Sequence, residues 1–187
     1  MGTQDLSLNL SSFKEAVGLG TRPNRYEVTM DIPGGSHEMK AEVSALSLPD
    51  SNIPPIGIPF RGRILKLPGD RRYGTWGFTV YDTIKPDHGL GLWGELHDWS
   101  NRINNHETNV TDFAYGDGDG GQDISSDTAT WSIAHYDLNG VGPIKYIQLH
   151  HCWPSNVGAF DLQYGAMDTL SQFSCQVEYE FFTLEEL

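Results

Sequence analysis

The chain has 187 residues, a length typical of one domain with a sizeable core. Its 25 acidic and 12 basic side chains give a formal charge of −13, which excludes a protein that grips nucleic-acid phosphates over its whole surface. No run of about 18 apolar residues occurs, and the N-terminal sequence does not join a basic segment to an apolar one, so we expect neither a membrane span nor a secretory signal. Cys152 and Cys175, the only cysteines, are expected to be buried reduced thiols, with one bridge between neighbouring strands left open.

The start of the chain predicts an arm followed by a β-hairpin. Residues 1–21 are expected to form the arm, with a short helix that ends near Val17. From Tyr26 to Ile32, apolar and polar side chains alternate, and a second alternation at 38–43 follows a glycine-rich turn. Alternation with a period of two is typical of half-buried strands, so the two stretches indicate a hairpin.

A proline-rich segment, residues 47–60, follows this hairpin. Its four prolines cannot donate ladder hydrogen bonds, so we expect a long loop in place of a central strand. The segment also carries large apolar side chains, whose exposure would be costly in a monomer. Two arrangements stay open: the loop folds over its own core, or it packs on another subunit. The side chains concerned are Ile53, Ile56, Ile58 and Phe60.

Six further strands and one helix are expected along the rest of the chain. Each expected strand is rich in β-branched or aromatic residues. The expected strands are Arg61 to Lys66, Thr75 to Tyr81, Ala129 to His135, Ile144 to Leu149, Ala159 to Tyr164 and Gln172 to Phe181. From Leu92 to Ile103, apolar side chains recur at helical spacing along one stripe, so this segment is predicted to be a helix. The sequence therefore predicts a mostly β protein.

Residues 107–127 have the composition of a solvated loop. They carry six acidic side chains, no basic one and a glycine-rich tract. The alternating carboxylates raise the alternative of a calcium site, but an EF-hand loop starting at Asp117 would need glycine and glutamate where Gln122 and Thr128 stand. Five of the twelve basic residues, by contrast, lie between Arg61 and Arg72, so charge is distributed unevenly along the chain.

No motif in the chain predicts an active site. Neighbouring residues on a strand point to opposite faces, so His150 and His151 are not expected to share a metal ion. Glu178 and Glu180 share one face of the last expected strand, as paired glycosidase carboxylates do, but a solvated strand face is a more common arrangement. We therefore expect no catalytic residue, no metal and no cofactor.

Three short stretches of the sequence form a specific series. They contain Arg22, Pro23 and Asn24; Gly69, Asp70, Arg71 and Trp76; and Trp153, Pro154, Asn156, Val157 and Gly158. In this order and spacing, over nearly the whole chain, the series resembles the tail tube proteins of contractile-tailed, T-even-like phages. That fold is shared by the tube proteins of type VI secretion and related injection machines.

The resemblance implies one domain over residues 1–187, an antiparallel β-sandwich or barrel with one flanking α-helix. Six subunits would form a ring around a shared inner β-barrel, and rings would stack into a tube inside a contractile sheath. The tape measure protein and double-stranded DNA would pass through the lumen without specific binding. The expected partners are other copies of the chain, the sheath, the baseplate and the tail terminator, and the expected place is the virion, after assembly in the host cytoplasm. The alternatives are a tube or adaptor ring of a contractile injection system, and a calcium- or carbohydrate-binding sandwich.

The tube hypothesis gives the charged and apolar side chains separate roles. Carboxylates on a strand face that lines the lumen would repel phosphates; the candidates are Glu27, Asp31, Glu38, Glu42, Glu178 and Glu180. Apolar side chains of the proline-rich segment and the basic stretch would contact neighbouring subunits or rings; the candidates are Ile53, Ile56, Ile58, Phe60, Arg71 and Arg72. A period of two does not say which face of a strand points inward.

Overall fold

A computed structural model describes residues 21–33, 38–39, 43–82, 91–110, 128–137 and 142–185. These residues form antiparallel strands and the helix α2 (Gly91–Ile103), which confirms the mainly β fold with one flanking helix. Within the described ranges, no helix is long and apolar enough to cross a bilayer.

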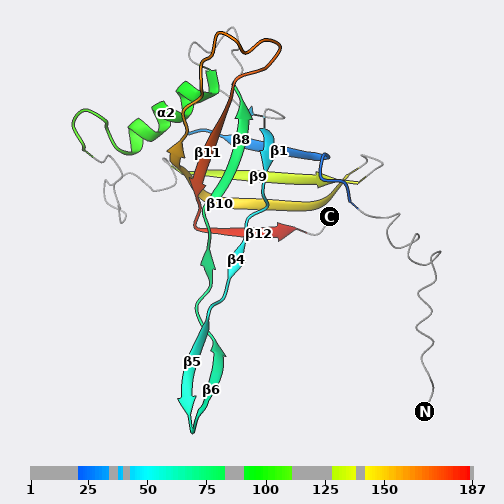
Figure 1. Cartoon of the computed structure of the whole chain (residues 1–187), viewed down its shortest axis with the longest axis vertical. Coiled ribbons are helices and arrows are strands. Elements are labelled where there is room, and N and C mark those ends of the chain that lie inside the picture. The colour runs from blue at the N-terminus through cyan, green and yellow to red at the C-terminus, as the bar shows by residue number, and fades with distance from the viewer. Residues whose placement is uncertain are drawn as a thin grey trace, which may run out of the picture.

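One sheet of eight strands folds into two layers around the core (Figure 1). The first layer consists of β1 (Tyr26–Asp31), β2 (Glu38–Met39), β9 (Ala129–Tyr136), the first half of β10 (Pro143–Val157) and β12 (Phe181–Glu185). The second layer consists of the last part of β10 with β3 (Val43–Leu46), β8 (Trp76–Tyr81) and β11 (Gln172–Glu178). Figure 1 shows the strands of the two layers running crosswise, as in orthogonal packing.

The long strand β10 connects the layers because a bulge bends it in the middle. It pairs with β9 up to Cys152 and with β12 up to His150, whereas from Trp153 to Val157 it pairs with β11. The register with β9 shifts between Leu149 and Cys152, and His151 has a φ of 54°. An extra residue in one strand increases the local bend and twist, so a single strand can serve two crossing layers.

Trp131 of β9 lies at the centre of the core. Its ring lies 6.0 Å from that of Trp76 and 5.8 Å from those of Phe78 and Trp99, in tilted or edge-on arrangements typical of aromatic pairs. Its Nε1–H donates to the backbone oxygen of Asp31 at 2.8 Å, which satisfies the only polar atom of a fully buried side chain. Trp99 belongs to α2, so the same contact holds the helix against the sheet, as the helical stripe predicts.

The expectation that residues 47–60 form a long loop is wrong. Residues 55–68 form a two-stranded hairpin, β5 (Pro55–Phe60) and β6 (Arg63–Pro68), that projects away from both layers (Figure 1). Prolines are tolerated because neither strand has a further neighbour that needs their missing N–H groups. The two-residue turn has positive φ at both Arg61 (45°) and Gly62 (80°), the geometry that matches the twist of paired strands. A short ladder of β4 (Ser51–Asn52) and β7 (Arg72–Tyr73) joins this long hairpin to the core.

Three other expected strands differ from the observed ones. The strand expected from Ile144 to Leu149 continues to Val157, and the one expected at 159–164 is irregular chain without a buried face. The last expected strand is divided at Tyr179 and Glu180 into β11 and β12. The break occurs because the backbone N–H of Glu180 donates to His150, so the chain leaves β11 and pairs on the other side of the β10 bulge.

Candidate functional site

Titratable side chains do not gather into a metal site in the described ranges, where no three His, Cys, Asp or Glu residues are grouped. The glycine-rich tract at 116–123, on which the calcium alternative depends, lies outside the described residues, as does Glu42. Both cysteines are unpaired and buried, and burial raises the pKa of each thiol to about 12. Cys152 and Cys175 therefore do not form the disulfide that the sequence leaves possible.

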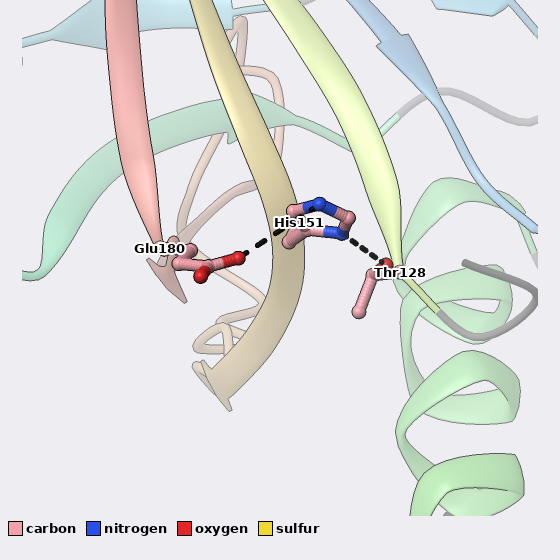
Figure 2. Close-up of polar contacts among 3 residues, drawn as sticks. All are labelled: Thr128, His151 and Glu180. Carbon is pink, nitrogen blue, oxygen red and sulfur yellow. Dashed lines mark hydrogen bonds and ion pairs between the residues drawn. The ribbon is translucent and has the colours of Figure 1, made fainter. Parts of the chain in front are cut away.

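Thr128, His151 and Glu180 lie in the order of a hydrolytic triad, but their geometry is that of a structural bracket (Figure 2). The Thr128 hydroxyl is 3.2 Å from Nδ1 of His151, yet Thr128 is only 7% exposed. On the other side, Nε2 of His151 lies 3.8 Å from the Glu180 carboxylate, beyond hydrogen-bond distance. The imidazole thus lies between the start of β9 and the break between β11 and β12.

The outward face of the first layer is polar and acidic. Along β1, Val28 and Met30 face the core, so Glu27, Thr29 and Asp31 face away from it. The residues that the ladders place on the same face are Ser132, Ala134 and Tyr136 of β9, Tyr146, Gln148 and His150 of β10, and Phe181, Thr183 and Glu185 of β12. Arg25, the residue before β1, accepts a backbone hydrogen bond from Tyr136 and so brings one basic residue to the edge of this acidic face. The Tyr136 hydroxyl donates to Glu27 at 2.9 Å and fixes this carboxylate on the face.

The six candidate carboxylates do not share one surface. Glu27 and Asp31 lie on the acidic face, and the register places Glu38 opposite Asp31 at its edge. Glu178 lies on the second layer, where the Thr75 hydroxyl donates to it at 2.6 Å. Glu180 stands in the strand break, so the expectation that Glu178 and Glu180 share one strand face is wrong.

Several residues of the three sequence motifs connect neighbouring segments of the chain. Arg22 offers its backbone oxygen to Nε2 of His135 at 2.8 Å, beside the turn of Pro23 and Asn24. Trp153, Pro154, Asn156 and Val157 all pair with β11. The N–H of Gly158 donates to Ser174 at 2.8 Å, and a Cβ at Gly158 would lie only 2.5 Å from that oxygen.

The second motif anchors the long hairpin. The Trp76 indole donates to the backbone oxygen of Ser47 at 2.6 Å, and Arg71 donates to the Ser51 hydroxyl at 3.1 Å. Asp70 is exposed beside Gly69, whose N–H donates to Pro54 at 2.9 Å. The base of the hairpin is therefore held on both sides, so the hairpin projects from a fixed position.

The long hairpin presents apolar and basic side chains together. Phe60 at its tip is 66% exposed, and the Arg61 guanidinium lies over the ring at 5.5 Å. The hairpin carries three positive charges and no negative one. Its other exposed apolar side chains are Ile53 at the base and Ile56, Ile58, Ile64, Leu65 and Leu67 on the strands. The hairpin therefore does not fold over the core of its own subunit, and its apolar side chains stay exposed, as packing on another subunit would require.

A second exposed apolar segment was not predicted. The apical loop, residues 158–171 between β10 and β11, exposes Leu162 (84%) and the side chains of Tyr164, Met167 and Leu170. Part of it, residues 159–164, was expected to be a strand because of its aromatic residues. The pair of glycines that bracket its first half, Gly158 and Gly165, is the signal that favours a loop.

Over 180 residues, the chain is 25% identical to the tail tube protein of Serratia phage KSP90, a match that covers 91% of this chain and 93% of the phage protein. A chain in the sheath-tube complex of an extracellular contractile injection system, PVC, in its extended state has a TM-score of 0.59 and 15% identity, covering 97% of this chain and 100% of that chain. A chain of the anti-feeding prophage baseplate, solved with 6-fold symmetrisation, also has a TM-score of 0.59, with 11% identity over 87% and 93% of the two chains. No family model matches the chain. The chain thus has a phage tail tube protein as a homologue and shares its fold with subunits of contractile injection machines.

Proposed function

We propose that this chain is the structural subunit of a phage tail tube, whose rings stack into a hollow conduit. The observation that carries the proposal is the sequence match to a tail tube protein along nearly the full length of both chains. The fold supports it independently, because a similar chain occurs in a sheath-tube complex at a TM-score of 0.59. The work of such a protein is assembly, so we propose no catalytic residue and no cofactor.

The ring is proposed to have six subunits that close one inner barrel. The first layer ends in β2 on one side and in β12 on the other, and among the described residues each of these outer strands pairs on one edge alone. Joining these edges between subunits would remove them, as barrel closure does within one chain. The 6-fold symmetry of the anti-feeding prophage baseplate supports this number.

The acidic face is proposed to line the lumen. A ring of six copies carries a formal charge of −78, six times −13. Carboxylates at Glu27, Asp31 and Glu38 would repel DNA phosphates and prevent adhesion in transit. We leave Glu178 and Glu180 out of the lining, because they belong to the second layer and to the strand break.

The proposed partners follow from a tube with two ends and an outer surface. Other copies form and stack the rings, and the sheath, baseplate and tail terminator contact the assembled tube in the virion. The tape measure protein and double-stranded DNA occupy the lumen in turn. Arg71 and Arg72, at the base of the long hairpin, are proposed to meet carboxylates of a neighbouring subunit and set the register of the ring.

Negative-stain electron microscopy of the purified chain tests the assembly. We expect six-fold rings and, at high concentration, tubes; a monomer that persists at high concentration contradicts the proposal. Charge reversal at Arg71 and Arg72 is expected to weaken ring formation at low salt, where charge pairs are least screened.

The lumen charge has a separate test. In particles assembled with Glu27→Gln and Asp31→Asn, tubes are expected to form normally while DNA ejection becomes slower. The matched control is Glu107→Gln with Asp98→Asn, which removes one exposed carboxylate within α2 and one beyond its end. Equal ejection rates for the two double variants would remove the acidic face from the lumen.

A tube or adaptor ring of a contractile injection system is a second candidate. The likeness to the PVC and anti-feeding prophage chains favours it. Copurification with a packaged genome distinguishes the phage tube from the injection particle. The calcium-binding alternative predicts heat in a calcium titration, and an absence of heat removes it.

A further inference from the structure

An open groove lies beside Tyr26, between the start of β1 and the strand β3. It consists of two neighbouring hollows of about 430 Å³ and 300 Å³, which share Pro23 and Tyr26 in their walls. Its apolar walls come from two layers of the sheet and from the chain beyond β3; they are Val28, Val43, Leu46, Leu48 and Ile133. Leu48 is 47% exposed at the rim. A hollowed apolar surface of this kind, here called the Tyr26 groove, is typical of a place that another segment covers.

The Tyr26 groove follows the outer edge of β3. This strand is the last in the order of the large sheet, and among the described residues it pairs with β8 alone. The Tyr26 hydroxyl donates to the backbone oxygen of Val43 at 3.0 Å, which satisfies one acceptor at the start of the strand. An edge strand beside an apolar groove is a template for one further strand, which gains main-chain hydrogen bonds from the edge and pockets for alternate side chains.

The N-terminal sequence of the same chain has the pattern that such an edge accepts. Residues 5–10 read Asp-Leu-Ser-Leu-Asn-Leu, with leucine at every second position. In a strand, this period of two puts all three leucines on one face and the polar side chains on the other. Asp5 is the one charged residue of the stretch and is acidic, whereas His135 and Lys145 line the groove. The stretch and the groove therefore match in apolar surface and in charge.

The connection between this stretch and the groove is short. Thr21 lines the groove, so only residues 11–20 separate it from Leu10. A connection of this length spans at most about 35 Å. A short tether holds a segment at a concentration on the order of millimolar around its own binding surface. The stretch therefore meets the groove of its own subunit more often than the groove of another copy.

We propose that residues 5–10 pair with the outer edge of β3 in their own subunit and place their leucines in the Tyr26 groove. The added strand covers a backbone edge and an apolar surface together, and thereby prevents the edges of two subunits from pairing with each other. This inference goes beyond the proposed tube function and does not depend on it, because the contact lies within one subunit.

Hydrogen–deuterium exchange of the full chain tests the contact through the backbone amides of β3. The variant with Leu6→Ser, Leu8→Ser and Leu10→Ser removes the apolar face, and we expect the amides at 43–46 to exchange at least tenfold faster in it. Peptides from β8 and β11 are expected to exchange as in the unaltered chain, because their ladder with each other stays intact.

Two exchanges of neighbouring side chains separate the alternation from the composition. Leu8→Asn with Asn9→Leu keeps the composition but breaks the period of two, and it is expected to speed the exchange of β3 severalfold. The matched control, Ser7→Asn with Asn9→Ser, keeps both the composition and the period, and its β3 amides are expected to exchange as in the unaltered chain.

The outcomes separate this inference from the tube function. If β3 exchanges equally in the unaltered chain and in the triple leucine variant, the added strand is overturned, whether or not tubes form. The measurement is made at two protein concentrations about a hundredfold apart, because only pairing between copies depends on concentration. Protection of β3 that is lost on dilution assigns the edge to a second copy and overturns pairing within the subunit. A chain whose β3 protection depends on the leucines, but which forms neither rings nor tubes, keeps this inference and loses the tube function.

Discussion

The hydroxyl of Tyr179 donates a hydrogen bond of 3.2 Å to the backbone oxygen of Asp50, so the end of β11 is tied to the base of the long hairpin. Burial, with a smaller contribution from the Asp50 carboxylate, raises the pKa of Tyr179 to about 12. The contact joins residues 129 positions apart in the chain. It therefore couples the orientation of the projecting hairpin to the chain at the end of β11.

Removing this donor is expected to loosen the hairpin and spare the fold. Tyr179→Phe keeps the ring, which lies 5.8 Å from that of Tyr73, and should cost about 1 kcal/mol of unfolding free energy. Urea denaturation measures the stability, and the critical concentration for tube growth, expected to rise, reports the hairpin. Unchanged stability together with unchanged growth would show that the hydrogen bond is not needed.

Truncating the central tryptophan is expected to be the most damaging core substitution. Trp131→Ala removes contacts to three other aromatic rings and the bond to Asp31, so we expect a loss of about 3–5 kcal/mol in unfolding free energy. Trp93→Ala, at a half-buried position of α2, is the comparison and should cost less. Thermal and urea unfolding measure both, and an equal loss would contradict the central position of Trp131.

The two glycines that bracket the first half of the apical loop are expected to respond differently to alanine. At Gly158 a Cβ would lie 2.5 Å from the Ser174 carbonyl oxygen, so Gly158→Ala should cost about 1–3 kcal/mol of stability. At Gly165 nothing lies within 4 Å of such a Cβ, and Gly165→Ala should change stability by less than about 0.5 kcal/mol. Denaturation curves of the two variants measure both losses of stability. A larger loss for Gly165→Ala than for Gly158→Ala would contradict the close approach of β10 and β11.

The buried thiols predict a loss of stability at alkaline pH. Because burial raises the pKa of Cys175 from 9.0 to about 12, its contribution to stability is fully present below pH 9 and is lost as the pH rises towards 12. The slope for one such thiol is about 1.4 kcal/mol per pH unit. Urea denaturation at pH 7 and pH 10.5 should show a smaller pH effect in Cys175→Ala, and in Cys152→Ala, than in the unaltered chain. An equal pH effect in all three chains would assign the alkaline loss to other groups.

The sequence interpretation identified most strands and the helix because these signals are local. The alternation at β1, β8 and β11 and the stripe of α2 are visible within a dozen residues, and the structure confirms them. The prediction for residues 47–60 was wrong because prolines exclude a central strand but are compatible with a two-stranded hairpin as well as with a loop. Composition does not distinguish the hairpin from the loop.

Composition and local motifs were enough to predict the mainly β class, the acidic balance and the resemblance to tail tube proteins. Three features became visible only in the folded chain: β10 bends at His151 to serve two layers, the last strand breaks at Glu180, and Glu27 and Glu178 lie on different surfaces. The physical reason is that a period of two separates the faces of one strand, whereas the partner of each strand depends on residues far away in the chain. Only the paired sheet shows which carboxylates share a face and which apolar segments stay uncovered.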